Sequence, residues 1–516
     1  MTKQNSNTVY STSNKRIAKN TFYLYLRMLM VMVVSLFTVR VVLNALGAED
    51  YGINNVVGGF VAMFAFLSST LTSASLRFFA YSIGKNDQEK LSQYFTMSFW
   101  CYAILAVVII VIAEPLGLWF VSNKMTIPAE RMDAALWVFH FSVISFAVKV
   151  ITVPYNSIVI AHERMNMYAI LGVVECVLKL GVAYLIYISP FDKLKTYSLL
   201  MFIMLVAVDG FYFIYGLGNF QECRIRRYWS RQMFTEIANY SGWSLFGALS
   251  SVARGQGINI LLNVFFNPIV NAARAIAFQV NTQISHFVLN FYKAVQPQIT
   301  KSYGAGDIEG MHSLVYRSSR FCYYLIFIIS LPVLLEADLI LTLWLKEFPD
   351  NTVLFTRLVI ITAIIDSTSY PLQTSISATG RIKYFQLITG GLLILNLPLA
   401  WIFLYYGCPP ESTMYVAMGV STVAQITRIA FAKHYINLSI HRYLHAVLSP
   451  ICAVTVLSFV LPLYVHSIMP EDILRFFIVS TISIITSLTM VWLLGITKDE
   501  RATLTNLVLS KLNLKR

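Results

Sequence analysis

Charged residues are few in this chain, at 12% of its 516 residues. Soluble globular domains carry about 25%. Hydrophobic residues make up 57% and the mean hydropathy is +0.65. Apolar runs of about 20 residues, the length that crosses a bilayer, recur from end to end. These features exclude a soluble protein and predict an all-α polytopic membrane protein without a sizeable soluble domain.

Cysteines and catalytic motifs are also scarce. The six cysteines are scattered and have neither disulfide nor metal-ligand spacing. The chain has no G-x-x-x-x-G-K loop followed by Ser or Thr, no G-x-S-x-G, no H-E-x-x-H and no pair of catalytic carboxylates. We therefore expect no metal site, no cofactor and no enzymatic activity, ATP hydrolysis included.

The apolar runs predict fourteen membrane-spanning helices. Pro154 and Pro371 are expected to break or kink the fourth and the tenth, because proline removes a helical hydrogen bond and clashes with the preceding turn. The expected helices span 17–46, 51–81, 91–120, 131–160, 165–188, 195–218, 233–265, 268–301, 314–345, 352–379, 383–406, 412–435, 444–466 and 472–495.

The segments around the two prolines resemble each other. The first reads Pro154-Tyr155-Asn156-Ser157 and continues to Ala161, Arg164 and Tyr168; the second, 217 residues later, reads Pro371-Leu372-Gln373-Thr374 and continues to Ala378, Arg381 and Phe385. A further match, 219 residues apart, joins Leu43-Asn44 to Leu262-Asn263. Two similar multi-helix halves are typical of secondary transporters, whose substrate path lies where the halves meet.

Six helices in each repeat would give both copies the same orientation in the membrane. We therefore expect two pseudo-symmetric six-helix lobes around a central cleft, followed by two extra helices. The expected parts are a cytoplasmic tail (1–16), an N-lobe (17–218), a basic cytoplasmic linker (219–232), a C-lobe (233–435), helices thirteen and fourteen (436–495) and a basic cytoplasmic tail (496–516).

Lysine and arginine are concentrated on one side of this topology. With the N-terminus inside, most of them fall in inner segments, including the four arginines of the 219–232 linker. Cytoplasmic segments carry such an excess in membrane proteins. Both termini are therefore expected in the cytoplasm. The net charge of +14 follows from this topology and implies no nucleic-acid partner.

Ionisable residues inside spanning helices are costly and mark candidate functional positions. Some lie near helix ends and could reach the interface as anchors instead; these are Arg27, Arg77, Arg357 and Arg428. Others lie deeper: Lys149, Glu175, Lys179, Asp209, Arg254 and Asp366 near mid-helix, and Arg40, Arg274 and Lys293 between centre and end. Glu175 and Lys179 are four residues apart and can pair on one helix face. The acids are either counter-ions or coupling sites for Na⁺ or H⁺.

Deep cations outnumber deep acids once the possible pairs are removed. A cavity with net positive charge favours an anionic ligand, and the planar fork of arginine suits phosphate. Amides cluster near Arg254 and Arg274, among them Asn259, Asn281 and Gln283. They indicate either a wetted cavity able to hold sugars or hydrogen bonds between helices.

Several local motifs resemble those of a known family. They are the Leu46-Gly47-x-x-x-Tyr51-Gly52 turn, Ser73 to Phe78 (Ser-Ala-Ser-Leu-Arg-Phe), Leu343-Trp344-Leu345 and Ala378-Thr379-Gly380-Arg381. With the helix order, they resemble the polysaccharide-biosynthesis (O-antigen) flippases of the multidrug/oligosaccharidyl-lipid/polysaccharide (MOP) superfamily. The resemblance covers nearly the whole chain.

The resemblance implies a MATE-like fold and a specific substrate. That substrate is an oligosaccharide repeat unit on undecaprenyl pyrophosphate, moved from the cytoplasmic to the periplasmic face of a bacterial inner membrane for O-antigen, capsule or exopolysaccharide assembly. A polysaccharide polymerase and a chain-length regulator are the implied partners, besides membrane lipids. The similar lipid II flippases place arginines on helices one, two and eight, where this chain has Arg27 or Arg40, Arg77 and Arg274.

Three alternatives stay open. A lipid II-type peptidoglycan precursor flippase would use the same pyrophosphate chemistry. A MATE-type cation-coupled drug exporter is disfavoured because many of these use an acid in helix one, and residues 17–46 contain none. A membrane glycosyltransferase or polymerase is disfavoured because such enzymes usually carry a large outer loop.

Overall fold

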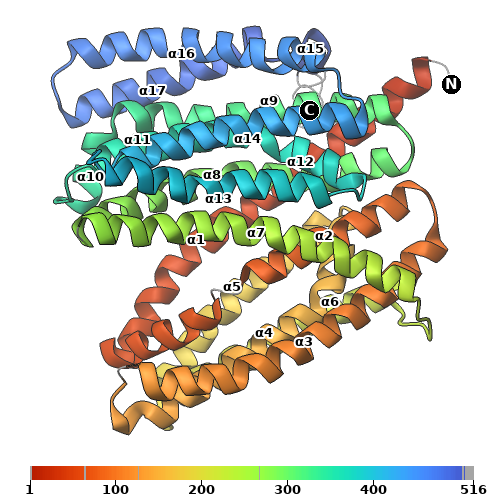
Figure 1. Cartoon of the computed structure of the whole chain (residues 1–516), viewed down its shortest axis with the longest axis vertical. Helices are drawn as coiled ribbons and strands as arrows, with labels where there is room; N and C mark the ends of the chain where they lie inside the picture. The colour runs from red at the N-terminus through yellow and green to blue at the C-terminus, as the bar shows by residue number, and fades with distance from the viewer. Residues whose placement is uncertain (1–2, 63–64, 126, 267, 503–504, 506–516) are drawn as a thin grey trace, which may run out of the picture. The chain divides into compact units, whose positions relative to one another are not determined.

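The computed structural model describes residues 3–62, 65–125, 127–266, 268–502 and 505, and these form helices without any β-strand (Figure 1). Some side chains inside the helices, that of Arg40 among them, lie outside what is described. The α-helices are α1 (Lys3–Ala62), α2 (Ala65–Gly84), α3 (Gln88–Lys124), α4 (Met132–Ala161), α5 (Met165–Ile188), α6 (Lys193–Asn219), α7 (Arg231–Phe265), α8 (Pro268–Gly304), α9 (Ile308–Leu335), α10 (Ala337–Leu345), α11 (Thr352–Ser367), α12 (Ser369–Ala378), α13 (Lys383–Tyr405), α14 (Ser412–Ile436), α15 (Ile440–Tyr443), α16 (Ser449–Ile468) and α17 (Ile473–Met490).

The all-α polytopic fold expected from the sequence is confirmed. Among the described residues, ten helices are long and apolar enough to span a membrane. The long helices α1, α2, α7 and α8 are not among the ten. These four helices carry Arg27, Arg77, Arg254 and Arg274.

Gly47 ends the first spanning segment without a loop. Its φ of 82° and ψ of 167° are non-helical, so α1 consists of two helices that meet at a kink. A φ near +80° is accessible to glycine because it lacks a Cβ. The Leu46-Gly47 turn is therefore a sharp bend at the boundary that the sequence predicted between helices one and two.

The two prolines of the repeat have different effects. Helix α4 continues through Pro154 to Ala161, so the helix is not broken there, and the kink that was the other alternative stays a prediction. In the second copy the helix is interrupted at Thr368, between α11 and α12, three residues before Pro371. There Ser367, Thr368 and Ser369 each donate a side-chain hydrogen bond to a carbonyl three residues earlier, and such bonds compete with the helical pattern.

The chain divides into two compact units, each described here by itself. Unit 1 comprises Met1–Arg16, Phe246–Tyr303 and Asp307–Arg516; unit 2 comprises Ile17–Leu245 and Gly304–Gly306. The dividing line falls inside α7. The six lobe, linker and tail segments expected from the sequence stay a prediction, and residues 506–516 of the basic tail lie outside the described part.

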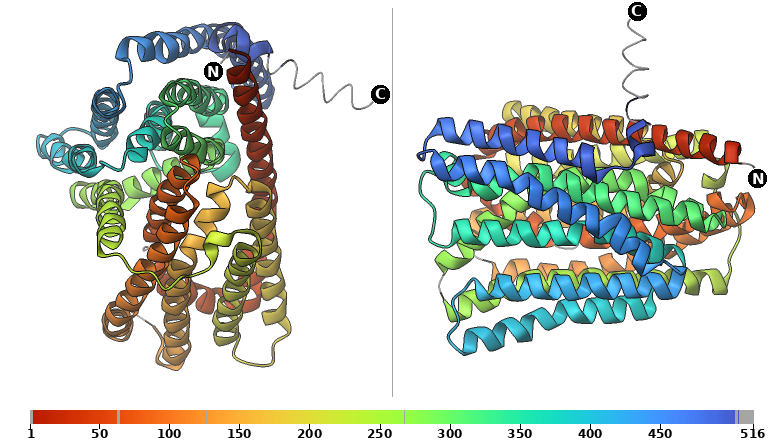
Figure 2. Two further views of the ribbon diagram at one scale, coloured as in Figure 1. Left: turned by 90° about the vertical axis from the view of Figure 1, so that its right-hand side faces the viewer. Right: turned by 90° about the horizontal axis from the view of Figure 1, so that it is seen from above.

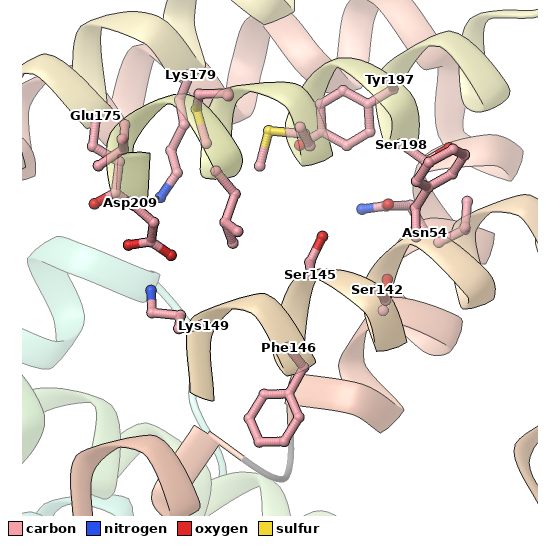
Figure 3. Close-up of a pocket in the computed structure, with 17 residues that line it drawn as sticks. Asn54, Ser142, Ser145, Phe146, Lys149, Glu175, Lys179, Tyr197, Ser198 and Asp209 are labelled. Carbon is pink, nitrogen blue, oxygen red and sulfur yellow. Dashed lines mark hydrogen bonds and ion pairs between the residues drawn. The ribbon is translucent and has the colours of Figure 1, made fainter. Parts of the chain in front are cut away.

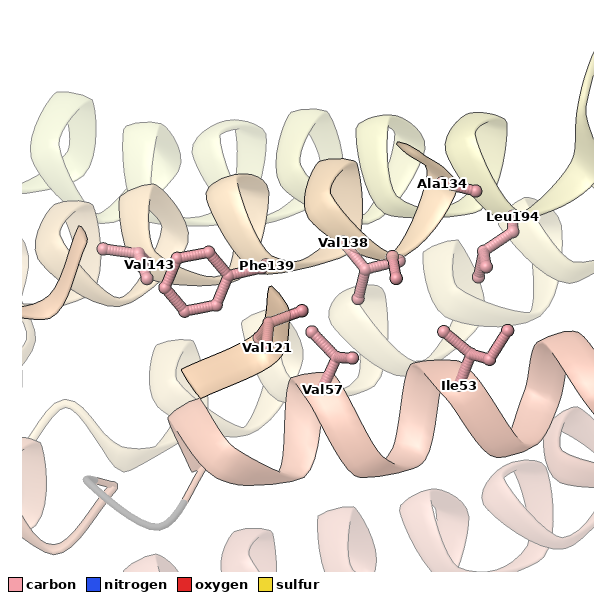
Figure 4. Close-up of a cluster of buried hydrophobic side chains, with 9 residues drawn as sticks. Ile53, Val57, Val121, Ala134, Val138, Phe139, Val143 and Leu194 are labelled. Carbon is pink, nitrogen blue, oxygen red and sulfur yellow. The ribbon is translucent and has the colours of Figure 1, made fainter. Parts of the chain in front are cut away.

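Each unit has its own buried core. In unit 2, α1, α3, α4 and α6 bury a cluster that includes Ile53, Val57, Phe139 and Val143 (Figure 4). Gly117 lets α3 approach α4 closely, because a Cβ there would lie 2.2 Å from the Phe139 ring. In unit 1, α8, α11 and α14 bury a cluster of Ala273, Ala277, Phe355, Leu358, Val359 and Met414.

Helices α16 and α17 pack on α9 within unit 1 (Figures 1 and 2). The fully buried Glu336 accepts a hydrogen bond from Arg475 Nη2 at 3.0 Å and lies 2.9 Å from His466 Nδ1. Arg320 on α9 pairs with Glu500 at 2.7 Å. Buried ion pairs therefore fix the C-terminal helices, which the sequence places outside the repeat, to α9.

Candidate functional site

Unit 1 contains a cavity of about 260 Å³, which we call the arginine cavity. It is lined by α7, α8, α11, α13 and α14, through residues that include Arg254, Arg274, Asn281, Asp366 and Asn396. The two arginines and Asn281, which the sequence singled out separately, thus face one space. Neither arginine forms an ion pair with a carboxylate of the described residues.

Arg274 on α8 is held from two sides. It is 7% exposed, its Nη1 donates a hydrogen bond to Asn259 Oδ1, and its guanidinium stacks on the Phe278 ring with 4.3 Å to the ring centroid. Asn259 itself accepts at its backbone carbonyl from Asn271, 3.0 Å away. Asn259 was expected to line the cleft; it accepts a hydrogen bond from Arg274 and is not among the residues that line the arginine cavity.

Among the described residues, the direct hydrogen-bond acceptors of Arg254 on α7 are neutral. Its Nη2 donates to the Ala417 carbonyl and to Ser421 Oγ, both at 3.3 Å. Ser421 Oγ in turn donates to Asp366 Oδ2 at 3.2 Å. The sequence left open whether Asp366 neutralises Arg254, and the structure joins them through one hydroxyl.

The direct partner of Asp366 is Arg428 on α14. Arg428 Nη1 lies 3.7 Å from Asp366 Oδ1, within ion-pair range but beyond hydrogen-bond distance. Arg428 is only 7% exposed, so the interfacial anchor considered from the sequence is wrong. Its position near a helix end suggested exposure, whereas its helix packs against α11 and α12.

Asn396 was missed entirely by the sequence reasoning. It is fully buried on α13 and lines the arginine cavity, and neither its amide nitrogen nor its amide oxygen has a hydrogen-bond partner among the described residues. Buried amides are almost always hydrogen-bonded. A lone Asn in an apolar helix is the signal that could have identified it.

Unit 2 contains a different cavity, of about 330 Å³, which we call the lysine–carboxylate cavity (Figure 3). Lys149, Glu175, Lys179 and Asp209 gather at one end of it, and Asn54, Ser142, Ser145, Tyr197 and Ser198 lie at the other. Lys179 Nζ donates to Glu175 Oε1 at 2.7 Å, so the expected pair forms. Asp209 Oδ2 is buried without a hydrogen-bond partner among the described residues.

Two arginines of unit 2, Arg27 and Arg77, lie against aromatic rings. The Arg27 guanidinium lies 4.5 Å from the Tyr168 ring centroid and touches Gly172, where a Cβ would meet Arg27 Nε at 1.9 Å. Arg77 Nη1 lies 3.7 Å from Glu236 Oε1, and the Arg77 guanidinium carbon lies 4.6 Å from the Phe78 ring centroid. Glu236, which also accepts from Tyr94, was not anticipated as its counter-ion.

The remaining expected site residues are placed elsewhere. Gln283 and Lys293 are exposed on α8 and line neither of the two cavities. The backbone of Arg40 belongs to α1, but its side chain lies outside the described residues. Among the described residues no group of three or more His, Cys, Asp or Glu side chains could hold a metal ion.

Comparison with solved structures identifies the architecture. The chain is 15% identical to a MATE crystallised in complex with MaD3S, with a TM-score of 0.71. It is 16% identical to the outward-facing form of a multidrug resistance MATE family transporter of the MOP superfamily, with a TM-score of 0.71. In both comparisons 82% of this chain aligns with 96% of the other.

The fold is that of the MATE transporters. A MOP superfamily transporter from Pyrococcus furiosus is also similar, with 16% identity, a TM-score of 0.66 and the same coverage; for that protein, a binding pocket of reversed polarity is said to suggest a different function. No protein-family profile and no curated protein matches the sequence. The likeness therefore supports the expected MATE-like fold, while the substrate has to be argued from the cavities.

Proposed function

We propose that the protein is a flippase that moves undecaprenyl-pyrophosphate-linked oligosaccharides from the cytoplasmic to the periplasmic face of a bacterial inner membrane. The observation that carries this proposal is the arginine cavity, in which Arg254 and Arg274 face one space and, within the described part of the chain, neither is in direct contact with a carboxylate. Two guanidiniums offer parallel N–H donors to phosphate oxygens. A drug exporter for organic cations would need the opposite charge.

The cavity also offers neutral polar groups for a glycan. Asn281, Ser251, Thr362 and Thr413 line it, and Asn396 adds a buried amide without a partner. A sugar headgroup loses its hydration on entering the membrane, at a cost of several kcal/mol for each unpaired polar group. In the proposed cycle of alternating access these side chains replace that water, the arginines hold the pyrophosphate, and the polyprenyl tail stays in lipid.

The direct test is transport by purified protein in liposomes that contain an undecaprenyl-pyrophosphate-linked glycan. Exposure of the glycan on the far leaflet is measured with a membrane-impermeant lectin or glycosidase. We expect headgroup translocation by the wild type and little by Arg254→Ala or Arg274→Ala variants that insert normally. Equal transport by both variants and the wild type would refute the assignment.

A second candidate function rests on the other cavity. Asp209 and Glu175 in unit 2 provide carboxylates that a cationic drug or a coupling Na⁺ or H⁺ could use, as in a MATE-type exporter. Extrusion of cationic dyes from cells, lost on Asp209→Asn but unchanged by Arg274→Ala, would favour this function over the flippase. The liposome test also distinguishes the proposed flippase from a lipid II-type flippase, because the two would transport lipid carriers with different glycans.

The cellular setting is part of the same proposal. We place both termini and the 219–232 segment in the cytoplasm, with a polysaccharide polymerase and a chain-length regulator as partners on the periplasmic side. Reporter fusions or cysteine labelling at these positions test the topology. Termini on opposite sides of the membrane would contradict an even number of spans and the two-repeat organisation.

A further inference from the structure

Asp366 stands between two arginines of unit 1 that have different roles. It is at ion-pair distance from Arg428, at 3.7 Å, and it reaches Arg254 through the Ser421 hydroxyl. Arg428 does not line the arginine cavity, whereas Arg254 and Asp366 do. The carboxylate therefore has one partner behind the cavity and a second possible partner inside it.

Local structure explains how Asp366 comes to lie there. It occupies the last turn of α11, just before the interruption at Thr368. The facing helix α14 presents Ser421, Gln425 and Arg428, which share a face because they are spaced by four and three residues. Gln425 Nε2 donates to Thr368 Oγ1 at 2.9 Å, so the interruption is fixed against the same helix face that supplies both neighbours of Asp366.

The arginine with which Asp366 pairs determines the net charge that the cavity presents to a ligand. When Asp366 neutralises Arg428, Arg254 and Arg274 together keep two positive charges. That matches a diphosphate diester, which has one ionised oxygen on each phosphorus. When Asp366 instead neutralises Arg254, only one cation is left for the ligand, and the nearby carboxylate repels an anion.

We propose that Arg428 is a positioning residue that keeps Arg254 available for an anionic headgroup by holding Asp366 behind the cavity. Asp366 is then an internal competitor of the ligand, linked to Arg254 by Ser421. This inference rests on the proposed function, because the ligand considered is a diphosphate diester. It adds a role for Arg428, a residue that does not touch the ligand.

The test measures binding to purified protein in nanodiscs by calorimetry. The probe is a short-chain isoprenyl methyl diphosphate, which is doubly charged, and the control probe is the singly charged isoprenyl methyl phosphate. We expect Arg428→Met to weaken binding of the doubly charged probe by about tenfold or more, because Asp366 then pairs with Arg254. Arg428→Lys keeps a cation at this position and should stay within about threefold of the wild type.

The decisive result is second-site rescue. Adding Asp366→Asn to Arg428→Met removes the competitor and should restore binding of the doubly charged probe to within about threefold of the wild type. A merely structural role of Arg428 would not produce this rescue. Wild-type affinity of Arg428→Met, or a double variant as weak as the single one, would overturn the proposal.

Three further variants keep the test decisive. If Arg428→Met fails to fold, as judged by detergent size exclusion, Asp366→Asn alone decides. It should bind the doubly charged probe at least as tightly as the wild type, and weaker binding would overturn the proposal. Arg254→Ala and Arg274→Ala test the proposed function separately. If they lose binding while Arg428→Met retains it, only the role of Arg428 is refuted.

Discussion

The two cavities hold similar numbers of ionisable side chains but distribute charge differently. In unit 2, the cations Lys149 and Lys179 face the acids Glu175 and Asp209, so the lysine–carboxylate cavity is balanced. In unit 1, Arg254 and Arg274 share their cavity with Asp366, whose direct partner is Arg428. The difference teaches that charge pairing, rather than the count of charged residues, distinguishes the two cavities.

The type of cation reinforces this contrast. Unit 2 uses lysine in its cavity, a compact charge on a flexible stem, while unit 1 uses arginine, whose rigid fork matches phosphate geometry. The repeat shows the same divergence in the backbone. Helix α4 runs unbroken through Pro154, whereas the corresponding helix of unit 1 is interrupted beside Asp366. The two proline segments, which resemble each other in sequence, therefore differ in backbone structure.

The largest expected effect comes from removing one cation from each cavity in turn. Arg274→Ala should reduce flipping about 100-fold, because loss of a buried charge partner costs several kcal/mol in binding. Arg274→Lys should recover only part, since lysine lacks the fork. Lys149→Ala in unit 2 should reduce flipping less than about fivefold. The liposome assay checks all three, and an equal loss for Arg274→Ala and Lys149→Ala would erase the contrast.

A smaller effect is expected from Asp209, whose Oδ2 is buried without a hydrogen-bond partner among the described residues. Asp209 lies beside Lys149 at one end of the lysine–carboxylate cavity (Figure 3), and we predict that it takes up a coupling cation. Asp209→Asn should lower transport driven by a Na⁺ or H⁺ gradient about tenfold and leave gradient-free exchange unchanged. The measurement is transport with and without each gradient. If gradient-driven transport survives, unit 2 has no coupling role at this position.

Much of this arrangement could be predicted from the sequence, and the rest depends on contacts across helices. The apolar runs located the spans, and the spacing of Glu175 and Lys179 predicted their pair, because both signals are local. That Arg254 and Arg274 face one cavity was an expectation from composition. The partner of Asp366 was not predictable, since Arg428 is distant in sequence and its depth depends on how α14 packs.

Asn259 and Arg77 likewise have partners that could not be predicted from the sequence. The amide of Asn259 looked like part of a wetted cleft, but the turn between α7 and α8 brings it against Arg274. Arg77 has a counter-ion at Glu236, more than 150 residues away in sequence. A residue's chemistry is visible in the sequence, whereas its partner is set by tertiary packing.

The balanced pair of unit 2 should behave as a structural unit. Glu175→Gln or Lys179→Met alone should lower the free energy of unfolding by about 1 kcal/mol, a value below that of a fully buried pair because both side chains are partly exposed. The double variant should regain most of this stability and keep transport. Thermal unfolding in detergent and the liposome assay check it. A stable but inactive double variant would instead assign ion coupling to Glu175.

The smallest expected effect concerns an ion pair at a helix end of unit 2. Asp192 precedes α6 and accepts from Arg131 Nη1 at 2.6 Å and from the backbone N–H of Lys195 at 3.0 Å. Partial burial alone would raise the Asp192 pKa, but these hydrogen bonds outweigh it and lower the pKa below its usual value. Arg131 also binds Asp50 on α1, so the cluster joins α1, α4 and α6.

A carboxyl whose pKa is lower in the folded state stabilises the fold above its unfolded pKa, and this contribution is lost as pH falls through the folded pKa. We therefore expect Asp192→Asn to melt a few degrees below the wild type at pH 7, as is typical of about 1 kcal/mol or less in a chain of this size. The gap should begin to close as the pH falls below about 4, the usual pKa of an unfolded aspartate, and should close fully only below the lowered pKa of Asp192 in the folded protein. Unit 1 offers the matched control, because Glu336 is fully buried between Arg475 and His466 and Glu336→Gln should destabilise more strongly at pH 7. Melting curves of both variants between pH 3 and 7 measure this difference, and a gap for Asp192→Asn that widens on acidification would show that the carboxylate is not stabilised by its partners.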